Sequence, residues 1–341
     1  MQPYLGPSFQ LVDTIEWADL ARDNRFGPRT KPLLVKGAVR AWPAWQRWGF
    51  ENLAELRRPD GSEVVRRFQN GLVEQGETRQ PLNLPVAPYL RELAQLSRLP
   101  RGDDKGLLSV RRMNQLVDGE RFHLDWSYLR TFQADRVYLA LWNVLEEFPQ
   151  LRRDFAIRLL WPGWRWTWEF AFIGPAQTVT GLHYDFPDNW FCQVRGTKEV
   201  IVFPPDQSSH MCPSLKYDRG STLSNVNISR LDEQPVESAA FAKAHGYFAR
   251  VEAGDALFIP KRNWHAVVAQ QPSISLGVFG LTLWEIISQG GPLEVGNLLH
   301  KLHLYRWGNC ICHKTLATSP RPRPNHIQAL EREPAEGVTT H

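Results

Sequence analysis

Residues 179–203 read Val-Thr-Gly-Leu-His-Tyr-Asp-Phe-Pro-Asp-Asn-Trp-Phe-Cys-Gln-Val-Arg-Gly-Thr-Lys-Glu-Val-Ile-Val-Phe, and this stretch decides the fold. Its β-branched and aromatic runs are separated by Pro-Asp and by Arg-Gly-Thr, which are typical of turns. The pattern predicts three short strands in succession, at 179–184, 190–194 and 199–203. Strands this short and this closely spaced favour a sandwich or a barrel.

The same spacing continues on both sides of this stretch. From Arg136 onward, Gly, Pro, Asn and Asp break the apolar runs about every ten residues. Further strands are predicted at 137–141, 168–173, 256–259, 266–269 and 274–279. We therefore expect a mainly β fold with flanking helices and a double-stranded β-helix (jelly-roll) core.

The flanking regions have a different pattern. Asp13 and Thr14 can cap a helix that runs to about Asn24. We also predict a strand at 32–37, a helix at 50–58, a loop at 70–85 and a helix around 89–96. The expected regions are an N-terminal α/β part (1–130), the barrel (131–284), a helical part (285–314) and a tail (315–341) too poor in apolar residues to fold alone.

The composition excludes several classes of protein. With 341 residues, 43% of them apolar, the chain can form a sizeable core. A net charge of +4 is a small surplus at this length, so we expect no specific nucleic-acid partner. We find neither a signal-peptide pattern nor an apolar run long enough to cross a membrane. Four cysteines are too few for a disulfide framework, so we expect a cytoplasmic protein.

A candidate metal site lies at His183-Tyr184-Asp185. Residues i and i+2 of a strand project from the same face, so this imidazole and this carboxylate can reach one ion together. Oxygenases that use Fe(II) need a second histidine to complete a set of two histidines and one carboxylate. His265 fits, because it follows a predicted strand and Pro260 and precedes another apolar run.

A His-x-Asp pair alone is weak support for a metal site, because such short patterns recur by chance. The chain contains a second copy, His123-Leu124-Asp125. This copy precedes the β-rich region, and a helical segment is expected to begin near Trp126. We expect the second pair to be structural.

Further motifs occur in order around the candidate ligands. Residues 180–185, 189–198 and 202–207 are followed by 254–260 and by Trp264-His265, and 32–37, 42–44 and Trp48 precede them. Together these motifs resemble the cupin-like JmjC hydroxylases, and most of all the factor-inhibiting-HIF type of asparaginyl hydroxylase. The resemblance covers roughly residues 10–284 and is densest over 136–268. Several motifs in one order are more specific than any one of them.

The resemblance implies iron as Fe(II), with 2-oxoglutarate and O2 as cosubstrates, and His183, Asp185 and His265 as the iron ligands. A buried 2-oxoglutarate needs a cation and hydrogen-bond donors around its distal carboxylate. In relatives a lysine at the position of Lys198 binds this carboxylate, and hydroxyl groups at the positions of Thr180 and Tyr138 assist it. Asn189 matches a family position near the iron.

The same residues also have ordinary interpretations. Without the resemblance, Lys198 is typical of a solvated hairpin. Thr180 is typical of any strand and Tyr138 of any core. Asn189 follows Pro187-Asp188 and is typical of a turn.

Two departures from the family concern the substrate. Where relatives usually carry an asparagine on the last barrel strand, residues 275–280 read Ser-Leu-Gly-Val-Phe-Gly. Ala140 stands where the asparaginyl hydroxylase carries a glutamine that helps to hold its substrate. Both differences leave the predicted iron site intact, and both weaken the case for asparagine as the substrate.

The reaction that the resemblance implies is hydroxylation of an unactivated C–H bond in a protein or peptide side chain, with release of succinate and CO2. Hydroxylation of a small metabolite and N-methyl demethylation stay open. Two other classes are a non-catalytic metal-binding cupin and a cupin isomerase or dioxygenase that does not use 2-oxoglutarate. The latter needs more histidines and no buried lysine, so Lys198 distinguishes it.

The C-terminal region carries two weaker signals. Residues 285–313 occupy the place where relatives carry dimerising helices, so we expect either a homodimer through them or a helix packed within the chain. Cys310-Ile311-Cys312-His313 lacks the usual spacing of a zinc site, and we expect these thiols to be structural or incidental.

Overall fold

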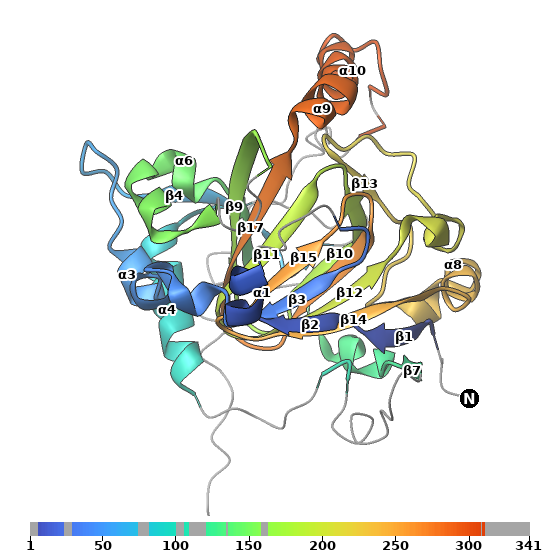
Figure 1. The fold of residues 1–341 in the computed structure, drawn as a ribbon, viewed down its shortest axis with the longest axis horizontal. Helices are drawn as coiled ribbons and strands as arrows, with labels where there is room; N and C mark the ends of the chain where they lie inside the picture. The colour runs from blue at the N-terminus through green and yellow to red at the C-terminus, as the bar shows by residue number, and fades with distance from the viewer. Residues whose placement is uncertain are drawn as a thin grey trace, which may run out of the picture.

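The computed structural model describes residues 6–23, 29–73, 82–99, 106–108, 121–133, 136–157, 163–307 and 309–310. Two facing β-sheets form its centre (Figure 1). The middle strands of the first sheet are, in order, β10 (Val179–Asp185), β16 (Trp264–Ala269), β12 (Lys198–Phe203) and β14 (His245–Val251). Those of the second sheet are β15 (Ala256–Ile259), β11 (Asp188–Arg195), β17 (Ser273–Leu281) and β9 (Trp166–Gly174).

The chain passes back and forth between the two sheets. It runs from β9 in the second sheet to β10 in the first, then to β11 in the second and β12 in the first, and β15, β16 and β17 alternate in the same way. Every neighbouring pair among these middle strands is antiparallel. This arrangement is a double-stranded β-helix and confirms the predicted fold class.

Short strands extend both sheets beyond these middle strands. The first sheet gains β13 (Ser221–Leu223) and β5 (Leu72–Val73) beside β10, and β1 (Ser8–Leu11) and β7 (Phe122–His123) beyond β14. The second sheet gains β3 (Leu33–Lys36) and β2 (Asp13–Glu16) at one edge. At its other edge lie β8 (Val137–Trp142), β4 (Val65–Asn70) and β6 (Leu82–Pro85).

Helices flank the barrel on several sides. The α-helices are α1 (Trp17–Asp23), α2 (Ala44–Arg47), α3 (Phe50–Ala54), α4 (Val86–Arg98), α6 (Val144–Glu147), α8 (Pro235–Phe241), α9 (Leu283–Glu285) and α10 (Gly291–Lys301). A π-helical turn (Ile286–Gly290) joins α9 to α10. Short 3-10 helices span Val39–Ala41, Trp126–Thr131, Pro149–Asp154, Pro205–His210 and Leu231–Glu233.

Alternation of side chains along each strand produces separate apolar cores. Val200 and Val202 of β12 face inward and pack with Leu257 and Ile259 of β15 between the sheets. Residues of the opposite phase, such as Phe258 of β15, pack outward against α2, α3 and α4. A strand buried on both faces reads as a continuous apolar run, which is why β12, β15 and β16 were predictable.

All eight predicted strands form, but one of the eight middle strands of the barrel was not among them. Residues 137–141 form β8, but β8 lies outside β9 at the edge of the barrel, and the missing barrel strand is β14. The sequence of β14, His-Gly-Tyr-Phe-Ala-Arg-Val, contains glycine and charge and hides the strand pattern. Gly246 is required there, because a Cβ would lie 2.6 Å from the Val202 carbonyl oxygen.

Several predictions for the flanking regions were also imprecise. The predicted helix at 13–24 begins only at Trp17, because residues 13–16 pair in parallel with β3 as strand β2. Tertiary pairing overrides the local capping signal there. The predicted loop at 70–85 contains β5 and β6, and its residues 74–81 lie outside the described part of the chain. The predicted helix at 50–58 ends at Ala54.

The C-terminal helical region is present as predicted through Lys301, where α10 ends. In Figure 1, α9 and α10 project away from the two sheets. Within the described residues, none of the helices is both long enough and apolar enough to cross a membrane.

Candidate metal centre and its surroundings

The three candidate ligands converge at the β10–β16 pair. His183 and Asp185 lie on β10, and His265 lies on β16 directly opposite His183 in the antiparallel register. Their ligand atoms all lie within 4.8 Å of one another. Asp185 Oδ2 is 3.7 Å from His183 Nε2 and 3.6 Å from His265 Nε2. Among the described residues this is the one group of three that could hold a metal ion.

Backbone contacts orient both imidazole rings toward this point. His183 Nδ1 lies 2.8 Å from the carbonyl oxygen of Gly181, and His265 Nδ1 lies 3.0 Å from that of Asn263. A backbone carbonyl only accepts hydrogen bonds, so each Nδ1 must carry the proton and donate it. Nε2 is then left as a lone-pair donor on each ring, which is the tautomer that a metal ligand needs.

Burial sets the electrostatics of the triad. Burial raises the pKa of Asp185 to about 6, although the neighbouring His183 lowers it. The pKa of His265 lies well below its usual range, because burial and the nearby His183 disfavour the imidazolium form. A divalent cation would stabilise the carboxylate and require neutral imidazoles, so the residues fit a metal.

A β-bulge places Thr180 on the same face as His183. Thr180 pairs with Val267 and His183 with His265, so β10 advances three residues while β16 advances two. Residues three apart would otherwise face opposite sides of a strand, and the extra residue corrects the phase. Thr180 Oγ1 lies 3.5 Å from the hydroxyl oxygen of Tyr138, which comes from β8. Burial raises the pKa of Tyr138 to about 12, so this hydroxyl keeps its proton.

Lys198 is a buried cation near these hydroxyl groups. Lys198 is the first residue of β12. Its side chain points between the sheets and is 1% exposed. Among the described residues its Nζ has no hydrogen-bond partner. It lies 5.6 Å from the ring centre of Tyr138 and 5.4 Å from that of Phe191. Burial lowers the pKa of Lys198 to about 7. An anionic ligand would stabilise a buried ammonium group of this kind.

The second sheet supplies a different set of groups. Asn189 lies at the start of β11 in register with Phe279 of β17, and its Oδ1 is buried without a partner among the described residues. Asn189, Phe191 and Gln193 follow one another at intervals of two residues along β11, so their side chains all point inward, between the sheets. Gln193 Oε1 accepts a hydrogen bond from Ser275 Oγ at 2.7 Å.

The departures noted in the sequence lie in this sheet. A Cβ at Gly277 would lie 3.1 Å from the rings of both Phe172 and Phe279, so aromatic side chains crowd this part of the 275–280 stretch. Ala140 lies on β8 and is half-buried.

The second His-x-Asp pair has structural partners. His123 Nδ1 lies 3.0 Å from the carbonyl oxygen of Pro7. Asp125 caps the following 3-10 helix, because its Oδ1 accepts hydrogen bonds from the backbone nitrogen and hydroxyl group of Ser127. These contacts agree with the structural interpretation. Of the C-terminal residues, Cys310 is buried, whereas Cys312 and His313 lie outside the described residues.

Sequence reasoning missed the turn at 260–263 that precedes His265. The backbone nitrogen of Arg262 donates to the Asp185 carbonyl oxygen at 2.8 Å, and that of Lys261 donates to Asp188 Oδ1 at 2.8 Å. Burial raises the pKa of Asp188 to about 6. Pro260 indicates a turn. The residues that form hydrogen bonds with this turn come from distant parts of the chain, so the local sequence does not predict them.

Comparison with known proteins adds to this geometry. A family model described as a cupin-like domain matches residues 20–279. "Lysine-specific demethylase JMJ31" of Arabidopsis thaliana is 22% identical over 347 residues, which cover 97% of this chain and 60% of that protein. "JmjC domain-containing protein D" of Dictyostelium discoideum is 26% identical, covering 74% of this chain and 52% of that protein. "tRNA wybutosine-synthesizing protein 5" of Gallus gallus is 24% identical, covering 74% and 71%.

We predict that the triad binds Fe(II) and that the second pair does not. Under anaerobic conditions, Fe(II) at 100 times its dissociation constant should stabilise the wild-type protein by about 2.7 kcal/mol, visible as a rise in the unfolding temperature. His183→Ala, Asp185→Ala and His265→Ala should each lose this shift. His123→Ala and Asp125→Ala are the matched controls and should keep it. Equal loss in the controls would show that the wrong pair was chosen.

Proposed function

We propose that this chain, which belongs to the cupin-like domain family, is an Fe(II)- and 2-oxoglutarate-dependent oxygenase. One observation carries the proposal: the ammonium group of Lys198 is buried, has no hydrogen-bond partner within the described parts of the chain, and lies on the same inward face as His183 and His265. A barrel that only binds a metal has no need of this group. An oxygenase that holds a dicarboxylate beside its metal does.

The residues divide the binding of this pair between them. His183, Asp185 and His265 would hold Fe(II) on one face of the ion and leave its other face open. Lys198 would pair with the distal carboxylate of 2-oxoglutarate, while Thr180 and Tyr138 would donate hydrogen bonds to it. When bound, Fe(II), 2-oxoglutarate and O2 supply the oxidation that hydroxylates an unactivated C–H bond and releases succinate and CO2. We assign Asn189, with its unpartnered buried oxygen, to the wall near the iron.

The protein's contribution is to fix geometry and exclude water. Phe191, Val200 and Val267 pack between the sheets around the polar groups. Water is kept from the stem of Lys198, and the resulting low dielectric strengthens any pairing of its ammonium group with an anion. The rings of His183 and His265 are already held by backbone carbonyls, so little reorganisation is needed when the metal binds.

We predict that Lys198→Met weakens 2-oxoglutarate binding by two to three orders of magnitude. Methionine keeps much of the apolar stem and removes the charge, and deleting one partner of a buried charge pair costs about 3 to 5 kcal/mol. Titration of 2-oxoglutarate into the anaerobic Fe(II) protein, followed by the visible band of the Fe(II) chelate, measures this affinity. Fe(II) affinity should change little, because the triad is untouched.

The pH dependence of the same titration provides a second readout. Without ligand the pKa of Lys198 is about 7, and a bound carboxylate raises it because only the ammonium form pairs with the anion. Affinity should therefore be fully present below pH 7 and fall as the pH rises above it, by up to about tenfold per pH unit. Lys198→Met should show no such slope. Wild-type affinity in the methionine variant would disprove the assignment of Lys198, and absence of the band in wild type would favour a non-catalytic cupin.

For the substrate we propose a protein or peptide side chain, hydroxylated at carbon. The motif resemblance to the factor-inhibiting-HIF type supports hydroxylation, while Ala140 and the stretch 275–280 argue against asparagine as the target. The relatives broaden the choice, since one is named as a lysine-specific demethylase and another as a tRNA wybutosine-synthesizing protein. This chain spans less than two thirds of the length of the Arabidopsis and Dictyostelium relatives. We therefore take the activities in the relatives' names only as alternatives to hydroxylation for this chain. A small metabolite is a further alternative.

We expect the iron-loaded protein to consume 2-oxoglutarate in the presence of a protein fraction of the host extract, and to add one oxygen atom to a peptide. Mass spectrometry of the fraction distinguishes the outcomes, because hydroxylation adds an oxygen and demethylation removes a methyl group. Turnover that is sensitive to ribonuclease and insensitive to protease would instead assign an RNA substrate, and would also overturn our expectation that no specific nucleic acid binds.

We also propose that the protein is cytoplasmic and forms a homodimer through residues 285–313. Cys192 and Cys212 are free thiols, which suits a reducing compartment. Val295 and Leu298 of α10 and Leu302, directly after its end, recur at three- and four-residue spacing and are each more than half exposed. Trp284, at 73% exposure, extends this apolar surface onto α9. A second copy would cover the same patch on both chains.

We predict that Leu298→Glu converts the dimer into a monomer, because a charge would be buried in the apolar interface. Light scattering coupled to size-exclusion chromatography measures the mass directly. Val236→Glu is the matched control, because Val236 is 76% exposed on α8, away from the C-terminal helices. A wild-type protein that is monomeric at all concentrations would contradict the dimer.

A further inference from the structure

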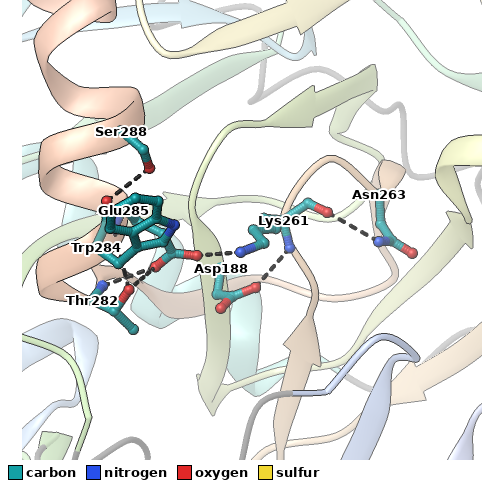
Figure 2. Close-up of polar contacts among 7 residues, drawn as sticks. All are labelled: Asp188, Lys261, Asn263, Thr282, Trp284, Glu285 and Ser288. Atoms are coloured by element: carbon teal, nitrogen blue, oxygen red, sulfur yellow. Dashed lines mark hydrogen bonds and ion pairs between the residues drawn. The ribbon is translucent and has the colours of Figure 1, made fainter.

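Hydrogen bonds from distant parts of the chain converge on the turn at 260–263, two residues before His265. The backbone nitrogen of Lys261 donates to Asp188 Oδ1, and its carbonyl oxygen accepts a hydrogen bond from Asn263 Nδ2 at 3.2 Å. The side chain of Lys261 reaches the other way and forms an ion pair with Glu285 (Figure 2). Figure 2 shows both contacts of Lys261, from its ammonium group to Glu285 and from its backbone nitrogen to Asp188.

This turn is conformationally strained. The backbone nitrogen of Asn263 donates to the carbonyl oxygen of Pro260 at 3.1 Å, so Lys261 and Arg262 are the central residues of a β-turn. Arg262 adopts a φ of +59°, which is unfavourable for a residue with a side chain. Such a conformation persists only where surrounding contacts hold it in place. The partners of Lys261 are therefore part of what keeps the turn in this form.

Glu285 is well suited to hold the turn. It is 5% exposed, and its Oε2 accepts hydrogen bonds of 2.9 Å from both the backbone nitrogen and the hydroxyl group of Thr282. Together they form a capping box at the start of α9. These hydrogen bonds hold the Glu285 carboxylate in place independently of Lys261. Its other oxygen, Oε1, forms the ion pair with the ammonium group of Lys261.

The turn at 260–263 contacts both strands that carry the candidate ligands. The backbone nitrogen of Arg262 donates to the carbonyl oxygen of Asp185. The carbonyl oxygen of Asn263 accepts the hydrogen bond from His265 Nδ1 that orients the ring. A shift of the turn would therefore rotate the His265 ring and move the backbone that carries the Asp185 carboxylate.

We propose that Lys261 and Glu285 are positioning residues for the iron site: their ion pair holds the strained turn, and the turn orients His265 and Asp185. The inference rests on the proposed function, because it takes the triad to be the iron site. It adds a role for two residues that lie outside the triad. It also links the ligand geometry to the start of the C-terminal helices.

The test is the affinity of the metal-free protein for Fe(II), measured by anaerobic calorimetry well below the unfolding temperature. Groups that orient metal ligands are worth about 10- to 100-fold in affinity, and this pair acts one contact further away, so Lys261→Met and Glu285→Gln should each weaken binding about five- to tenfold. The double variant should be no weaker than either single variant, because both remove the same interaction. Lys261→Arg keeps the ion pair and should restore nearly wild-type affinity.

Controls separate positioning from general loss of structure. Glu294→Gln on α10 breaks a different ion pair, with Arg219 at 2.6 Å, and should leave Fe(II) affinity unchanged. Lys261→Met preserves the capping box, so it carries the test if Glu285→Gln does not fold. If wild type binds Fe(II) and both variants bind it equally well, the positioning role is wrong while the proposed function stands. If wild type binds no Fe(II), the proposed function fails and the inference fails with it.

Discussion

His183 and His265 lie directly opposite each other where β10 pairs antiparallel with β16, and the rest of the site depends on this register. A slip by one residue would turn one imidazole to the outer face of the sheet, because side chains alternate along a strand. Apolar residues that alternate with inward-facing ones along β16 prevent such a slip. Trp264, Ala266 and Val268 pack in the outer core, and a slip would remove them from it. Hydrophobic patterning thus specifies the geometry of a polar centre.

Burial of Lys198 lowers the stability of the fold. Lowering its pKa from 10.5 to about 7 corresponds to a destabilisation on the order of 4 kcal/mol at pH 7, present below pH 7 and lost as the pH approaches the unfolded value. Weak attraction to the rings of Tyr138 and Phe191 offsets only part of this cost. A fold under selection for stability alone would place methionine or leucine there.

The strand pattern and the His183-Tyr184-Asp185 spacing were readable from sequence, because both follow from the period of two along a strand. His265 was found from its place between a proline and an apolar run, and the structure brings it beside the other two residues. The importance of Lys198 was not readable from its local context, which resembles an exposed hairpin, and it emerged only through family resemblance. Strand β14, and the contact of Lys261 with Glu285, arise from tertiary pairing and leave no periodic signal.

The two sheets contribute unequally to the site. Of the groups proposed to bind iron and 2-oxoglutarate, the triad, Thr180 and Lys198 lie on the first sheet, with Tyr138 reaching in from β8. On the second sheet, Phe279 stacks on Trp168 with an angle of 15° between the rings, and Phe170 meets Phe279 edge-on. Asn189, Phe279 and Trp168 are neighbours in register at the end of the barrel where the chain turns from Asp185 into β11. If the triad holds the metal as we propose, this aromatic wall would shape the end of the barrel where a substrate enters, so substitutions along β9 and β17 would change substrate choice more than metal binding.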